Sequence, residues 1–207
     1  MGVQSEENAL KAKFAAMVCA WLGLCFLPGV APLRAQQKNI DAERSTLTVR
    51  VFKAGFFSAF AHNHEIRAKI AEGKLTESDP GGIQFKVLAK SLEVVDAEES
   101  AKNRAEIQAH MQDDVLEIAR YPEIAFRSTS VEKTAPARWT VKGELTLHGQ
   151  TRAQVVTVNR GNKGYTGTVN LKQSDFGIKP FSAAGGTVKV KDVVEIDFTI
   201  EAGESRP

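Results

Sequence analysis

The sequence predicts an all-β fold, an eight-stranded antiparallel β-barrel into which one α-helix is inserted. Eight segments alternate apolar and polar residues with the period of two that is typical of a half-buried strand. One mostly polar segment with helical spacing follows the third of them, and Gly, Asn, Asp and Pro residues separate the others. Closure into a barrel removes exposed sheet edges. A β-sandwich is the alternative, because alternation alone does not exclude it.

Three strands are expected before the helix. The first covers 46–53, where Leu47, Val49 and Val51 lie on one side. The second covers 66–73 and ends at a glycine. The third covers 83–87 and follows the turn sequence Asp-Pro-Gly-Gly.

The helix is expected at about 97–111, a segment without proline, glycine or a β-branched run. Its apolar stripe is thin, with Ile107 and Met111 as its main members. We therefore expect the helix to lie across other structure rather than inside it.

Five further strands complete the predicted barrel. The last has the clearest alternation, with Val194, Ile196, Phe198 and Ile200 interleaved with polar residues. A loop with glycines and aromatic residues, 174–186, precedes it. The five strands are expected at 124–131, 139–147, 155–160, 165–171 and 194–200.

Residues 1–35 have the pattern of a secretory signal peptide or an N-terminal membrane anchor. Lys11 and Lys13 precede an uncharged run, 14–33, and Ala35 is a candidate cleavage point. Either interpretation places residues 36–207 across a membrane, as one domain with a substantial core. Cys19 and Cys25 both lie in the uncharged run, so this domain contains neither a disulfide nor a thiolate metal site.

The charge balance argues against a nucleic-acid partner. The chain has 27 Lys and Arg against 25 Asp and Glu, a formal net charge of +2. Proteins that bind nucleic acid or an anionic membrane mainly by charge carry a larger basic excess.

The stretch 56–66, FFSAFAHNHEI, places three phenylalanines beside two of the four histidines. In an extended segment His62 and His64 project to one face. That geometry suits two metal ligands, two contacts to a polar head group, or a strand end whose histidines bond to loops.

Small residues on the predicted inward faces suggest unfilled volume inside the barrel. Ala68, Gly143 and Gly167 interrupt runs of large apolar residues. They predict either a dry tunnel that takes a long apolar chain, or bulges and bends of the kind that closed barrels need.

The sequence offers little for catalysis. The exported domain has no cysteine, no Gly-x-Ser-x-Gly motif and no phosphate-binding glycine loop. A metal held by His62, His64, His110 and His148 is the remaining route, and nothing in the sequence brings these residues together. We therefore expect no enzyme, no catalytic residue and no cofactor. A metal-binding protein or metal-dependent enzyme using His62 and His64 is the alternative.

Four segments in order resemble the signatures of YceI-like proteins: FSAFAHNH at 57–64, YPEIAFRS at 121–128, GELTLHGQT at 143–151 and DFGI at 175–178. Ala61 stands where that family commonly has glycine. The resemblance spans 46–202 and implies a lipocalin-like barrel that binds polyisoprenoids, isoprenoid quinones or other long amphiphiles in the periplasm or outside the cell.

The predicted partner is thus a long-chain isoprenoid or another amphiphilic lipid, sequestered or carried in an apolar interior. A homodimer and transient membrane contact stay open, as does a structural role with the barrel filled by its own side chains. The candidate ligand-binding residues are Phe56, Phe60, His62, His64, Ile66, Ala68, Phe85, Met111, Phe126, Gly143, Leu145, Phe176 and Phe181.

Overall fold

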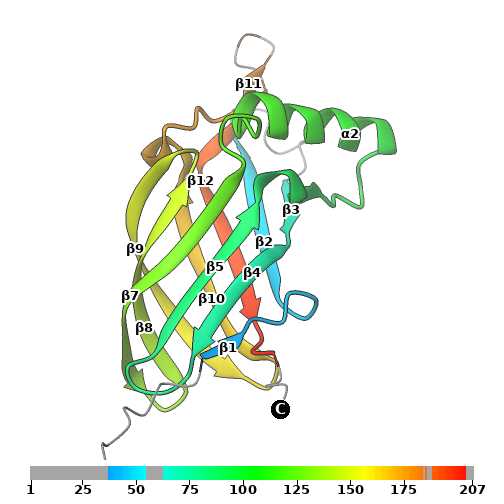
Figure 1. The fold of residues 1–207 in the computed structure, drawn as a ribbon. Coiled ribbons are helices and arrows are strands. Elements are labelled where there is room, and N and C mark those ends of the chain that lie inside the picture. Colours follow the sequence, from blue (N-terminus) through cyan, green and yellow to red (C-terminus); the bar gives the residue numbers. More distant parts are fainter. Residues whose placement is uncertain (1–36, 55–62, 184, 186–187, 204–207) are drawn as a thin grey trace, which may run out of the picture. The chain divides into compact units, whose positions relative to one another are not determined.

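The β-strands of the computed structural model form one curled antiparallel sheet (Figure 1). The structure describes residues 37–54, 63–183, 185 and 188–203, all within the unit Ala35–Pro207. The predicted signal or anchor segment, Phe56, Phe60 and His62 lie outside the described residues. Among those described, no helix combines the length and apolar character needed to cross a bilayer.

In the part of the chain that the structure describes, twelve strands make up this sheet. They are β1 (Gln37–Asn39), β2 (Thr46–Ala54), β3 (His64–Ala68), β4 (Ile70–Thr76), β5 (Gly82–Leu88), β6 (Glu93–Val94), β7 (Glu123–Ala135), β8 (Arg138–Leu147), β9 (Gln150–Gly161), β10 (Gly164–Lys172), β11 (Ser182–Ala183) and β12 (Val188–Ile200). The helical elements within the described residues are η2 (Ala89–Ser91), α2 (Ala101–His110), the π-helical turn η3 (Met111–Val115) and η4 (Gln173–Phe176).

The strand order is β1-β4-β5-β7-β8-β9-β10-β12-β2-β3-β6. The chain itself links the two sides of this sheet, because only Lys69 separates β3, which pairs with β2, from β4, which pairs with β5. A single bent segment thus joins the two sides of the sheet. The barrel wall consists of β2, β5, β7, β8, β9, β10, β12 and the bent strand formed by β3 and β4.

The predicted number of eight strands is wrong, for two physical reasons. The sequence pattern runs on through Lys69, so it does not separate β3 from β4. The strands β1, β6 and β11 contain only two or three residues, too few to show an alternation. The eight predicted segments nevertheless correspond to the long strands of the wall.

The helix α2 lies across one end of the barrel (Figure 1). It begins at the N-cap Ser100, whose hydroxyl accepts a hydrogen bond from the Asn103 N–H. None of its residues is buried, as the thin apolar stripe predicted. We call this the helix end, and we call the opposite end, which contains Glu77 and the β9–β10 turn, the far end.

Two phenylalanine rings fill the space beside two interior glycines. A Cβ atom at Gly143 would collide with the ring of Phe126, and one at Gly167 would collide with the ring of Phe198. Of the two alternatives given for these positions, unfilled volume is therefore wrong for Gly143 and Gly167. Each glycine instead lets an aromatic ring from a neighbouring strand lie against the sheet, an arrangement that lets strongly curved sheets pack.

Candidate functional site: an apolar cavity with a polar helix end

The barrel encloses a cavity of about 780 Å³ with a predominantly apolar lining. The inward side chains of the wall strands produce it, because alternate residues along each strand point to the same face. On β2 the lining residues are Leu47, Val49, Val51 and Lys53, and the other strands follow the same period. With β3 and β4 counted as one bent strand, eight strands surround the cavity, and a barrel of that size has room for one small or elongated ligand.

Every wall strand contributes apolar residues to the cavity. They include Ile66, Ala68, Leu75, Ile83, Phe85, Val87, Ile124, Phe126, Val131, Val141, Leu145, Leu147, Val156, Val158, Val169, Leu171, Val190, Val194, Ile196, Phe198 and Ile200. The rings of Phe85 and Phe126 are 5.7 Å apart on adjacent strands. Ile107, Met111 and Leu116 add apolar groups from α2 and the turn after it.

Most of the predicted site residues line this cavity. They are His64, Ile66, Ala68, Phe85, Met111, Phe126, Leu145 and Phe181. Gly143 and Phe176 are not among the lining residues, which corrects their expected placement: the Phe126 ring covers Gly143, and Phe176 is 1% exposed, packed in the core. Contact of any of these residues with a ligand stays a prediction.

Polar side chains gather where the cavity reaches the helix end. Lys53 and His64 come from the wall, and Glu99, Asn103 and Glu106 come from α2 and the segment before it. His110 also lines the cavity, with its ring 5.4 Å from that of Phe181 and its Nδ1 2.6 Å from Asp114 Oδ2. The lining is thus polar at the helix end, mainly apolar along the barrel, and polar again where Thr76 and Glu77 reach it at the far end.

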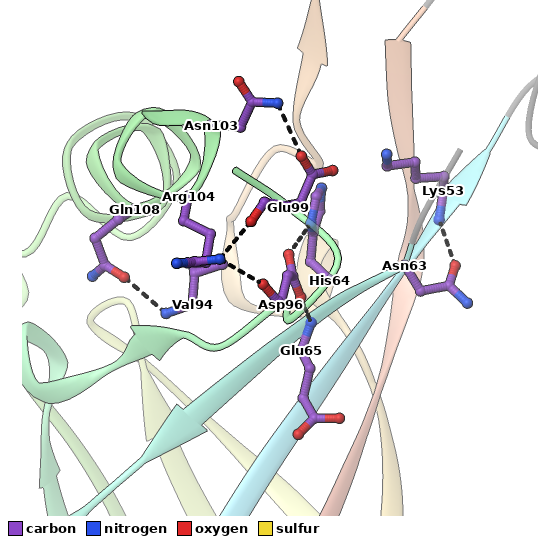
Figure 2. Close-up of polar contacts among 10 residues, drawn as sticks. All are labelled: Lys53, Asn63, His64, Glu65, Val94, Asp96, Glu99, Asn103, Arg104 and Gln108. Carbon is purple, nitrogen blue, oxygen red and sulfur yellow. Dashed lines mark hydrogen bonds and ion pairs between the residues drawn. The ribbon is translucent and has the colours of Figure 1, made fainter. Parts of the chain in front are cut away.

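Asp96 holds the His64 ring in place. Its carboxylate is buried, with the residue 7% exposed, and Oδ2 lies 2.6 Å from His64 Nδ1 while Oδ1 accepts a hydrogen bond from the Glu65 N–H at 2.6 Å (Figure 2). A buried carboxylate needs such partners to offset its lost hydration. With Nδ1 directed at Asp96, Nε2 is the ring nitrogen of His64 available to a ligand.

Polar contacts also attach α2 to the barrel. Gln108 accepts a hydrogen bond from the Val94 N–H at 2.8 Å and donates one to the Leu92 carbonyl at 2.7 Å. Arg104 donates to the backbone carbonyls of Asp96 and Glu99 (Figure 2). Together with the packing of the partly buried Ile107 against the core, these hydrogen bonds attach the helix, none of whose residues is fully buried.

The described histidines do not converge on a metal site. Within the part of the chain that the structure describes, no three His, Cys, Asp or Glu side chains are grouped as metal ligands. His64 contacts Asp96 and His110 contacts Asp114. His148 lies against the Tyr121 ring, with its Nδ1 3.2 Å from the Phe176 carbonyl oxygen.

Sequence reasoning missed Asp96, Glu77 and Tyr165. Asp96 lies 32 residues from His64, and Tyr165 lies 88 residues from its partner Glu77. Only the folded sheet brings these residues together. The available signal for Asp96 was weak: a single carboxylate directly after the apolar pair Val94 and Val95.

Comparison with known proteins is consistent with this architecture. The sequence model of the YceI-like domain matches residues 39–202, most of the chain. The chain belongs to the YceI-like family. The predicted family resemblance is thereby confirmed.

Curated relatives match over part of their length. A UPF0312 protein of Pseudomonas syringae pv. tomato is 35% identical over 115 residues, which is 50% of this chain and 57% of the relative. A UPF0312 protein of Vibrio cholerae is 33% identical over 101 residues, 44% of this chain and 53% of the relative. The chain thus spans little more than half the length of these curated relatives.

Two solved structures share the YceI-like fold at low sequence identity. Burkholderia cenocepacia BcnA is 17% identical, with a TM-score of 0.61 over 78% of this chain and 98% of that chain. A polyisoprenoid-binding domain from Saccharophagus degradans is also 17% identical, with a TM-score of 0.53 over 80% and 98% of the two chains. At this identity the likeness establishes the fold.

Proposed function

We propose that this YceI-like protein binds a long-chain isoprenoid lipid, of the polyprenyl or isoprenoid quinone type, with the tail inside the barrel. The observation that carries the proposal is the apolar cavity of about 780 Å³. Each methylene transferred from water into such a lining contributes about 0.8 kcal/mol, so a tail of a few isoprene units binds tightly without a hydrogen bond. The description of the Saccharophagus degradans neighbour as a polyisoprenoid-binding domain supports this choice.

The lipid head group is assigned to the helix end. Polar side chains line the cavity there, and the Asp96 carboxylate fixes the His64 ring among them. A neutral His64 with its proton on Nδ1 accepts a hydrogen bond at Nε2, as from a prenyl alcohol. A protonated His64 donates from Nε2, as to a carbonyl or phosphate oxygen. The activity is binding and carriage, without a chemical step.

The proposed location is the periplasm or the cell exterior. This part of the proposal is based on the charged start and long uncharged run of residues 1–35. Transient contact with a membrane is the route by which a carrier of such a lipid would load and unload. Cell fractionation of the native host, with immunodetection of the protein, tests the location.

Organic extraction of protein purified from its native host, followed by mass spectrometry, tests the binding proposal. We expect a prenyl lipid in near-stoichiometric amount, together with uptake of an added prenyl quinone by extracted protein. A sample with neither a co-purifying lipid nor uptake would contradict it. Elemental analysis of the same sample tests the alternative: a stoichiometric metal lost on combined His62→Ala and His64→Ala substitution would favour metal binding.

A further inference from the structure

A hydrogen-bonded cluster spans the far end of the barrel. Tyr165 Oη donates to Glu77 Oε1 at 2.9 Å, and Arg160 Nη1 lies 3.1 Å from the same oxygen. Arg160 also donates to Tyr165 Oη at 2.6 Å, and Lys38 Nζ lies 2.6 Å from Glu77 Oε2. Each of the two carboxylate oxygens of Glu77 is therefore paired with a cation.

The strand order places these residues on opposite walls. Glu77 follows β4 directly, and Arg160 is on β9. In one direction around the wall, β5, β7 and β8 lie between β4 and β9. In the other direction, β2, β12 and β10 lie between β9 and β3, the strand that continues into β4. A contact between these strands must therefore cross the barrel opening.

Aromatic rings lie at the end of the cavity beside this cluster. Tyr165 and Trp139 both line the cavity, with their ring centroids 5.7 Å apart in an edge-on arrangement. The Arg160 guanidinium lies 5.0 Å from the centre of the Tyr165 ring. The Tyr165 ring is thus held from one side by its neighbours and from the other by the hydrogen bond to Glu77.

We propose that Tyr165, held across the barrel by Glu77, is a floor that limits the length of the tail the cavity accepts. This inference depends on the proposed lipid-binding function and specifies its ligand class. A tail that enters from the helix end gains apolar contact until it reaches Tyr165. Any longer tail must fold back or stay partly in water, because passing the floor would separate paired charges.

Strand geometry sets the expected limit. Apart from Val188, which is 46% exposed, the cavity lining on β12 runs from Val190 to Ile200. At about 3.3 Å per residue and a strand tilt of roughly 40°, that stretch covers about 25 Å of the barrel axis. An extended isoprene unit adds four carbon–carbon bonds of about 1.5 Å, or roughly 5 Å of length, so about five units fit.

The test measures competition binding of prenyl alcohols with three to ten isoprene units by the intact protein. In the wild type, affinity should rise at least tenfold per unit up to about five units and less than twofold per unit beyond. Tyr165→Ala should move this break to longer tails by at least one unit. Glu77→Ala, which leaves the ring and the core packing intact, should raise the affinity for tails beyond the break at least threefold.

Lys163→Ala is the matched control. Lys163 is exposed in the β9–β10 turn, two residues before Tyr165, and its substitution should leave the break at the same tail length. If Tyr165→Ala does not fold, Glu77→Ala decides alone. The proposed floor alone would be wrong if wild-type affinity rose steadily with tail length, without a break. It would also be wrong if the break stayed at the same tail length in the folded variants. No binding by any member of the series would overturn the proposed function and the floor together.

Discussion

The phenyl ring of Phe126 lies over Gly143 on the neighbouring strand, in the space that a Cβ atom would need. Such an atom would also lie 2.7 Å from the Arg127 carbonyl oxygen, which is backbone and cannot rotate away. The barrel wall therefore requires glycine at this position. The same relationship holds between Phe198 and Gly167.

Gly143→Ala should destabilise the fold by about 1–3 kcal/mol, the usual cost of inserting an atom into a packed core. Urea unfolding measures the difference. Gly161→Ala is the control, because a Cβ there meets nothing within 4 Å, and its effect should stay within about 0.5 kcal/mol. Equal unfolding midpoints for the two variants would show that Phe126 can move aside freely.

Asp96→Ala should cost roughly 1–3 kcal/mol of stability, because it leaves the Glu65 N–H and the His64 ring without their buried acceptor. Asp114→Ala removes an acceptor at the same 2.6 Å distance from His110, but on an exposed surface, and should cost less than about 1 kcal/mol. Chemical denaturation compares the two. A cost for Asp96→Ala no larger than that of the control would mean that the His64 contact is not structural.

The Glu77 cluster should make stability depend on pH. The hydrogen bond from Lys38, with those from Tyr165 and Arg160, holds the pKa of the Glu77 carboxyl below its ordinary value of 4.5. A carboxyl with a lowered pKa in the folded state stabilises the fold above its unfolded pKa and loses that contribution as pH falls through the folded value.

Glu77→Gln should therefore lower the urea midpoint at pH 7, and the difference from wild type should shrink as pH falls below 4.5. Glu132→Gln, at an exposed position on β7, is the control. A difference for Glu77→Gln that is constant across this range would show that ionisation of Glu77 does not support the cluster.

Gln108→Ala should loosen α2 without unfolding the barrel. It removes both hydrogen bonds between this side chain and the backbone at Leu92 and Val94. Amide hydrogen exchange in 101–110 should become at least fivefold faster, while the strands of the wall keep their protection. Lys102→Ala, on the exposed side of the same helix, should leave the exchange unchanged. Equal exchange in both variants would mean that other contacts hold the helix.

Local patterns predicted the wall because each long strand repeats its apolar residue at every second position. On β12 the residues Val194, Ile196, Phe198 and Ile200 all line the cavity, as their alternation implied. The bend at Lys69 left no mark in that pattern, so β3 and β4 were predicted as one strand. A strand of only two residues, such as β6, is too short to show an alternation of apolar and polar residues in the sequence.

The interior was harder to predict than the wall. The sequence left Gly143 open between unfilled volume and a bend of the sheet, because it does not show that the Phe126 ring reaches across from the adjacent strand. Asp96 and Glu77 acquire their roles only through partners far away in the chain. Alternation identifies which residues face inward, whereas long-range register decides what each of them meets.

The central claim is that the barrel interior, rather than its surface, binds the lipid. Val155 and Val156 are neighbours on β9, the first 64% exposed and the second 9% exposed and lining the cavity. Native mass spectrometry with a four-unit prenyl alcohol should therefore be done on wild type, Val155→Trp and Val156→Trp. We predict one bound ligand per chain in wild type and Val155→Trp, and at least tenfold weaker binding in folded Val156→Trp. Undiminished binding by Val156→Trp, or no binding by wild type, would contradict the account.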